Sequence, residues 1–79
     1  METVRWQVIN ILSENFSIDI ETTSDDNQLV RDLQMDSIEL IQFGLDLESE
    51  FDLEIPDDAV RATMTIGEVV EQIVKLKAA

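Results

Sequence analysis

The sequence predicts an all-α protein, a small bundle of three main helices plus one short helix. Apolar residues recur at helical spacing in segments 3–16, 37–51 and 66–74. Two of these segments begin with residues that are typical of a helix N-terminus. No stretch alternates apolar and polar residues for long enough to indicate a strand. With 79 residues, the chain is expected to form one domain, residues 1–79, around one core.

The first predicted helix spans residues 3–16. Its buried face follows the i, i+4, i+7, i+8 pattern and consists of Val4, Val8, Ile11 and Leu12. Trp6 falls nearly opposite this face, so its ring is expected to be partly exposed.

Residues 17–36 are predicted to form a long loop, because the stretch "ETTSDDNQ" is rich in turn formers and poor in apolar residues. Leu29, Val30 and Leu33 are expected to hold this loop against the core through a helical turn. A loop of this length in a small domain often has a function.

A second helix is predicted from Ser37 to about Phe51. Asp36 suits the N-cap, and Glu39 stands three residues later, as in a capping box. Ser37 is therefore expected to be the first helical residue.

The remaining residues predict two further helices. Pro56 favours a short helix over residues 57–61. The last helix has a capping box from Thr65 to Glu68. Its apolar stripe consists of Ile66, Val69, Val70, Ile73 and Val74, and Lys75 and Lys77 lie in its last turns, where the helix dipole favours cations.

The second helix carries two apolar faces where a surface helix needs one. At about 100° per residue, its core stripe consists of Leu40, Phe43, Leu47 and Phe51. Ile38, Ile41 and Leu45 form a second face that lies roughly 130° away. Two interpretations remain open: the long loop covers the second face, or this face borders a cavity or docks a partner, with acidic residues as its rim.

The charge of the chain is strongly negative, with 18 acidic residues against five basic ones and a formal net charge of −13. Ten acidic residues lie between positions 32 and 58 without a lysine or arginine among them. Nucleic acid and anionic membranes are therefore not expected as partners, because both are bound through basic residues. A protein with a basic patch is the natural complement, although an acidic surface can also serve solubility alone.

Other features of the sequence exclude several classes of protein. No apolar run has the length of a membrane span, and the N-terminus lacks the features of a secretory signal. The chain has no cysteine, so it has neither a disulfide nor a thiolate metal site, and no EF-hand loop is present. We therefore expect a soluble cytoplasmic monomer without membrane insertion or a metal site.

Ser37 has no general base with which to act as a nucleophile. The chain contains no histidine, and its lysines stand near the C-terminus. No catalytic residue is therefore predicted, and the protein is not expected to be an enzyme. Ser37 is either a tolerated polar residue in a first helical turn or an exposed residue on which another enzyme acts.

The stretch "LQMDSIELIQFGLDLESEFDLEIPDD", together with "TIGEVVEQIV", resembles the acyl carrier protein family. The resemblance covers nearly the whole chain. It includes the Asp36-Ser37-Ile38 motif, the upstream "LVRDL" and the spacing from Ser37 to Pro56.

The resemblance implies that Ser37 carries a 4′-phosphopantetheine arm, which a phosphopantetheinyl transferase attaches from coenzyme A. Acyl groups would be carried as thioesters on this arm, for fatty-acid, lipid or polyketide biosynthesis, and loading and transferring enzymes would dock through basic patches. The residues implied in partner recognition are Asp36, Ile38, Glu39, Ile41, Leu45 and Glu48. Those implied in an acyl pocket are Leu40, Phe43, Gly44 and Leu47.

The chain departs from the family pattern at four positions. Gln34 and Met35 stand where the family usually has glycine and a small or apolar residue, and Gln42 replaces a common acid. Gly44 replaces a larger apolar residue, which indicates either a deeper acyl pocket or close helix packing. Two other functions remain as alternatives, a peptidyl or aminoacyl carrier and an unmodified acidic adaptor that binds a basic partner.

Overall fold

The computed structural model describes residues 2–55 and 64–78. These residues form three α-helices, α1 (Glu2–Phe16), α2 (Ser37–Phe51) and α3 (Ile66–Ala78), and one short 3-10 helix, η1 (Ile20–Thr22). No strand occurs in the two described ranges, so the all-α prediction is confirmed. The short helix predicted over residues 57–61 lies outside the described residues.

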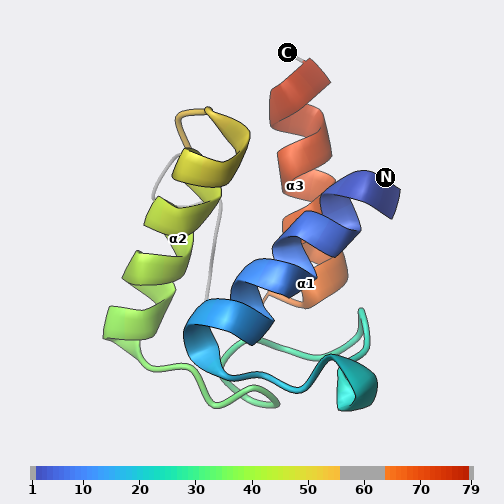
Figure 1. Cartoon of the computed structure of the whole chain (residues 1–79), viewed down its shortest axis with the longest axis vertical. Helices are drawn as coiled ribbons and strands as arrows, with labels where there is room; N and C mark the ends of the chain where they lie inside the picture. Colours follow the sequence, from blue (N-terminus) through green and yellow to red (C-terminus); the bar gives the residue numbers. More distant parts are fainter. Residues whose placement is uncertain (1, 56–63, 79) are drawn as a thin grey trace.

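Helix α1 packs against both α2 and α3. Its N-terminus lies at the same end of the molecule as the C-terminal ends of α2 and α3 (Figure 1). The buried side chains come from all three helices and from the loop after α1. They are Val4, Val8, Ile9, Ile11, Leu12, Leu29, Met35, Phe43, Leu47, Ile66, Val69, Val70 and Ile73.

The apolar faces predicted for α1 and α3 pack toward the core; in α3, Ile66, Val69, Val70 and Ile73 are buried and Val74 is half-buried. Each apolar residue of the predicted α1 stripe is buried, whereas the Trp6 side chain is 49% exposed. In α3, the Thr65 hydroxyl accepts the amide N–H of Glu68, and the Glu68 carboxylate accepts that of Thr65, so the predicted capping box is present.

The loop after α1 is bonded to the start of α3. The amide of Leu29 donates to the carbonyl of Met64, and that of Gly67 donates to the carbonyl of Asp25, at 3.1 and 2.9 Å. Gln28 and Thr65 form an isolated antiparallel bridge between these hydrogen bonds. Asp25 also accepts from the Arg5 guanidinium at 2.8 Å, which joins the loop to α1.

Residues 29–35 form a wide turn that is closed by backbone hydrogen bonds. The amide of Met35 donates to the carbonyl of Leu29, and the amide of Gln34 donates to that of Val30, both at 3.1 Å. Gln34, near the end of this turn, has a left-handed backbone, with φ of 60°. Leu29 and Met35, whose backbones one of these bonds joins, are both buried.

The prediction that Val30 anchors this loop is wrong, because its side chain is 39% exposed. The helical turn directs Leu29 and Leu33 toward the core, and Val30, next to Leu29 in the turn, points away from it. Met35 supplies the additional buried side chain that Val30 was expected to supply.

Among residues 2–55 and 64–78, no helix combines the length and the apolar composition that crossing a membrane requires.

Candidate functional site

Ser37 begins α2 and is exposed at its N-terminus. The preceding residue, Asp36, has an extended backbone and is the N-cap, as the sequence predicts. The carboxylate of Asp36 accepts the amide N–H of Glu39 at 2.8 Å, and the Glu39 carboxylate accepts that of Asp36 at 3.1 Å. This reciprocal capping box fixes the backbone on both sides of Ser37.

The Ser37 hydroxyl makes no hydrogen bond to the described part of the chain. The backbone amides of Ser37 and Ile38 also lack a partner there, because the cap satisfies the next amides of the helix. Free amides at a helix N-terminus favour a negatively charged group such as a phosphodiester.

The second apolar face of α2 is solvent-exposed. The side chains of Ile38, Ile41 and Leu45 are 78%, 67% and 54% exposed. The interpretation that the long loop covers them is therefore wrong, because that loop lies against α1 and the start of α3. Three neighbouring exposed apolar side chains on one helix are typical of a docking surface.

Within residues 2–55 and 64–78, Gly44 is not closely packed against another helix. A Cβ atom built on Gly44 would lie more than 4 Å from the neighbouring atoms of the described residues, outside its own helix. Gly44 also has no left-handed backbone that would require glycine. The described residues give no support to the close-packing interpretation of Gly44, and the deeper acyl pocket stays a prediction.

The four residues implied in an acyl pocket lie on one side of α2. Phe43 and Leu47 are completely buried, and Leu40 and Gly44 are half-buried. The rings of Phe43 and Phe16 pack edge to face, with their centroids 6.1 Å apart. In the structure these side chains belong to the core and its edge.

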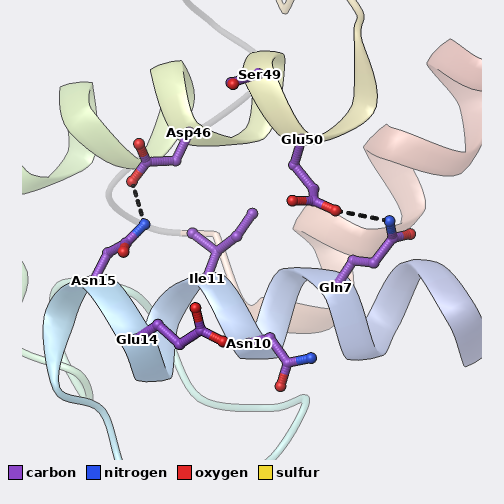
Figure 2. Close-up of a pocket in the computed structure, with 8 residues that line it drawn as sticks. All are labelled: Gln7, Asn10, Ile11, Glu14, Asn15, Asp46, Ser49 and Glu50. Atoms are coloured by element: carbon purple, nitrogen blue, oxygen red, sulfur yellow. Dashed lines mark hydrogen bonds between the residues drawn. The ribbon is translucent and has the colours of Figure 1, made fainter.

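Figure 2 shows an open polar groove between α1 and α2. The Gln7 amide donates to Glu50 and the Asn15 amide donates to Asp46, each at 3.0 Å, across the groove. Asp46 also accepts from Gln42 at 2.8 Å. These acidic side chains of α2 therefore help to hold α2 against α1.

The chain was then compared with known proteins. A family model described as "Phosphopantetheine attachment site" matches residues 6–73. The acyl carrier protein of Lactobacillus johnsonii is 40% identical over 72 residues, which cover 91% of this chain and 90% of the relative. That of Lactobacillus acidophilus is 36% identical over the same shares of both chains. That of Sinorhizobium fredii is 32% identical over 78 residues, which cover 99% of this chain and all of the relative.

The chain belongs to the acyl carrier protein family. Its role is that of an acyl carrier, and the cofactor of this family is phosphopantetheine. A carrier of this kind presents its cargo to enzymes, so interaction with enzymes is part of its role.

The residues at the start of α2 fit the cofactor of the acyl carrier family. A covalent arm on a serine requires a hydroxyl that is exposed, is not engaged in an internal hydrogen bond and has a fixed orientation. Ser37 meets the first two conditions, and the capping box meets the third. No group of three or more metal-ligating side chains is present among the described residues.

Three features of this acyl carrier site were missed in the sequence. The left-handed backbone of Gln34 lies just before Asp36, and the family's usual glycine at that position was the signal for it. The carboxylate of Glu48 accepts the amide N–H of Ile55 at 3.2 Å. The bonds of Asp46 and Glu50 to α1 depend on how the helices pack, and no local pattern in the sequence indicates them.

Proposed function

We propose that Ser37 is the residue that carries the 4′-phosphopantetheine arm, and that a phosphopantetheinyl transferase attaches it from coenzyme A. The observation that supports this proposal is the exposed, unengaged hydroxyl of Ser37 at the capped start of α2. Ser37 also lies inside the segment matched by the family model, residues 6–73.

The chemistry of attachment is divided between two proteins. The Ser37 Oγ forms a bond to the phosphorus of the pantetheine phosphate, and adenosine 3′,5′-bisphosphate leaves from coenzyme A. The chain has no histidine, so the transferase supplies the base that removes the hydroxyl proton. The arm, once attached, supplies a thiol on which acyl groups are carried as thioesters.

The chain's own residues hold the arm in position. The capping box of Asp36 and Glu39 orients the first turn of α2, and the free amides of Ser37 and Ile38 stabilise the charge of a phosphodiester. Leu40, Phe43, Gly44 and Leu47 would shelter the acyl chain, and the open space beside Gly44 supports this assignment.

We further propose that partner enzymes dock on the exposed face of α2. Ile38, Ile41 and Leu45 would supply apolar contact area. The acidic residues around them, with Asp36, Glu39 and Glu48 as the predicted contacts, would attract basic patches on the transferase and on the enzymes that load and remove acyl groups.

The cargo is proposed to be an acyl chain of fatty-acid, lipid or polyketide biosynthesis. The relatives are named acyl carrier proteins, which favours acyl cargo over the aminoacyl cargo of a peptidyl carrier. The cytoplasm remains the predicted location, and a monomer remains the predicted state.

The test is incubation of the protein with coenzyme A, Mg²⁺ and a promiscuous phosphopantetheinyl transferase. The wild-type protein is expected to gain the mass of one phosphopantetheine, and peptide mapping is expected to place it on Ser37. The modified protein should then react with a maleimide, which the cysteine-free chain does not do by itself.

Ser37→Ala is the matched control. Serine and alanine differ by only a few tenths of a kcal/mol in helix propensity, so this variant is expected to fold normally and to gain no mass. If several active transferases fail to modify the folded wild-type protein, Ser37 is not an attachment site. The acidic adaptor would then be the better account of the charge.

A further inference from the structure

Gln34 is a conformational outlier close to the proposed attachment site. Three non-glycine residues of the described chain have a left-handed backbone, Ser17, Gln34 and Asp52, with φ of 57°, 60° and 53°. Aspartate tolerates this conformation better than most residues, because its short side chain bonds locally. Glutamine has no such advantage, and a left-handed position favours glycine.

The fold does not account for glutamine at this position. The Gln34 side chain is exposed, and its amide makes no hydrogen bond to the described residues. The two bonds that close the turn are made by backbone amides, which glycine would supply equally well. A residue in an unfavourable conformation without a stabilising contact is a reason to look for a functional one.

The position of Gln34 indicates where that contact lies. Gln34 is three residues before Ser37, so their Cα atoms are at most about 11 Å apart. Met35, which lies between Gln34 and Asp36, is buried. Gln34 is therefore the nearest exposed side chain before the Asp36-Ser37 pair. Its carboxamide both donates and accepts hydrogen bonds.

We propose that the Gln34 carboxamide is a recognition contact for the phosphopantetheinyl transferase that modifies Ser37. This inference rests on the proposed function of Ser37. The transferase must bring its reacting groups to the Ser37 hydroxyl and therefore covers the neighbouring loop. Enzymes that act later work at the thiol, at the far end of the arm, and have no comparable need to contact Gln34.

The test compares loading kinetics of four proteins, the wild type, Gln34→Gly, Gln34→Asn and Asp52→Gly. Gln34→Gly removes the carboxamide and relieves the backbone. Gln34→Asn keeps a carboxamide on a residue that tolerates the left-handed conformation. Asp52→Gly places glycine at the left-handed residue at the opposite end of α2, roughly 22 Å from Ser37 along the helix.

The measurement is the initial rate of mass gain with coenzyme A and Mg²⁺, using a broad-specificity transferase and one dedicated to acyl carriers. Gln34→Gly is expected to melt at a higher temperature than the wild type. With the dedicated transferase, its kcat/KM is expected to fall about tenfold, mainly through a higher KM. This factor corresponds to about 1.4 kcal/mol. Gln34→Asn is expected to remain nearer the wild type, and Asp52→Gly to be loaded as the wild type is.

Two results would overturn the inference while leaving Ser37 as the attachment site. One is loading of Gln34→Gly by both transferases at the wild-type kcat/KM. The other is an equal loss in Asp52→Gly, which would assign the effect to backbone freedom or charge and not to the carboxamide. Failure of both transferases on the folded wild type is a different result, because it would overturn the proposed role of Ser37 and this inference with it.

Discussion

At the scale of single residues, the two glycines of the chain do not occupy its left-handed positions. In the described part of the chain, those positions hold Ser17, Gln34 and Asp52. Gly67 has a packing reason, because a Cβ there would lie 3.3 Å from the carbonyl oxygen of Asp25. Gly44 has no reason of this kind within the described residues, and a glycine inside a helix costs about 1 kcal/mol relative to alanine.

Gly44→Ala is therefore expected to stabilise the unmodified protein by about 1 kcal/mol. In a domain of this size the melting temperature should rise by roughly 4–8 °C. Thermal unfolding followed by circular dichroism measures the change. A lower melting temperature would show that Gly44 has a packing contact that the structure does not contain.

The effect of Gly44 on cargo is tested with Gly44→Val. If the open space beside Gly44 receives the acyl chain, valine should leave modification of Ser37 unchanged and disfavour long acyl chains. Loading of a series of acyl chains on wild type, Gly44→Ala and Gly44→Val gives the chain-length preference. The same preference in all three proteins would contradict the assignment of Gly44 to an acyl pocket.

At the scale of the helix, acidic residues of α2 accept hydrogen bonds that stabilise the structure, in addition to carrying charge. Glu39 belongs to the capping box, and Glu48 accepts the amide N–H of Ile55. Changing either residue to lysine would therefore remove a hydrogen bond along with the charge. The cost of losing a cap is typically about 1 kcal/mol, so lysine variants do not isolate electrostatic attraction.

Glutamine variants separate charge from structure at these two positions. Glutamine at the third position of a capping box retains the reciprocal bond, and its carbonyl can still accept from Ile55. The double variant Glu39→Gln/Glu48→Gln is expected to stay helical while its association with a basic partner enzyme slows and depends less on salt. Stopped-flow association rates at several NaCl concentrations measure this; an unchanged salt dependence would place the docking charges elsewhere.

The residues of the α2 core stripe are not equally buried. Phe43 is completely buried and contacts the ring of Phe16, whereas Phe51 is half-buried, with the Lys77 ammonium 5.7 Å from its ring centroid. Phe43→Ala is expected to cost roughly 3–5 kcal/mol, a large part of the stability of a small domain. Phe51→Ala should cost less. Urea unfolding of both variants tests the order, and a larger loss for Phe51→Ala would contradict it.

Helix boundaries could be predicted where capping chemistry is local. The capping boxes at Asp36 and Thr65 fix the starts of α2 and α3, and both lie within a few residues of sequence. Contacts between distant segments could not be predicted in this way. The bridge between Gln28 and Thr65 depends on where the loop meets α3. The sequence does not indicate this meeting point, and the expected burial of Val30 was therefore wrong. The apolar face of Ile38 was visible on a helical wheel, but its exposure depended on the path of the loop.

At the scale of the whole molecule, few acidic side chains of the described residues are paired with a basic one. The pair of Arg5 and Asp25 is the one salt bridge within residues 2–55 and 64–78. Asp46 and Glu50 are held instead by the amides of Asn15, Gln42 and Gln7. Such hydrogen bonds satisfy the carboxylates but leave their charge in place, so a net charge of −13 acts against the compact state.

The melting temperature is therefore expected to rise as NaCl is added, because the screening length falls from about 30 Å at 0.01 M to about 10 Å at 0.1 M. Asp52 and Glu54 offer a matched control, since their carboxylates accept no hydrogen bond from the described residues. The variant Asp52→Asn/Glu54→Gln should melt at a higher temperature than the wild type at 0.01 M NaCl and should gain less from added salt. Calorimetry of both proteins across the salt range measures the difference. A wild-type melting temperature that stays constant or falls would mean that the acidic residues are already far enough apart for their repulsion to have no effect on folding.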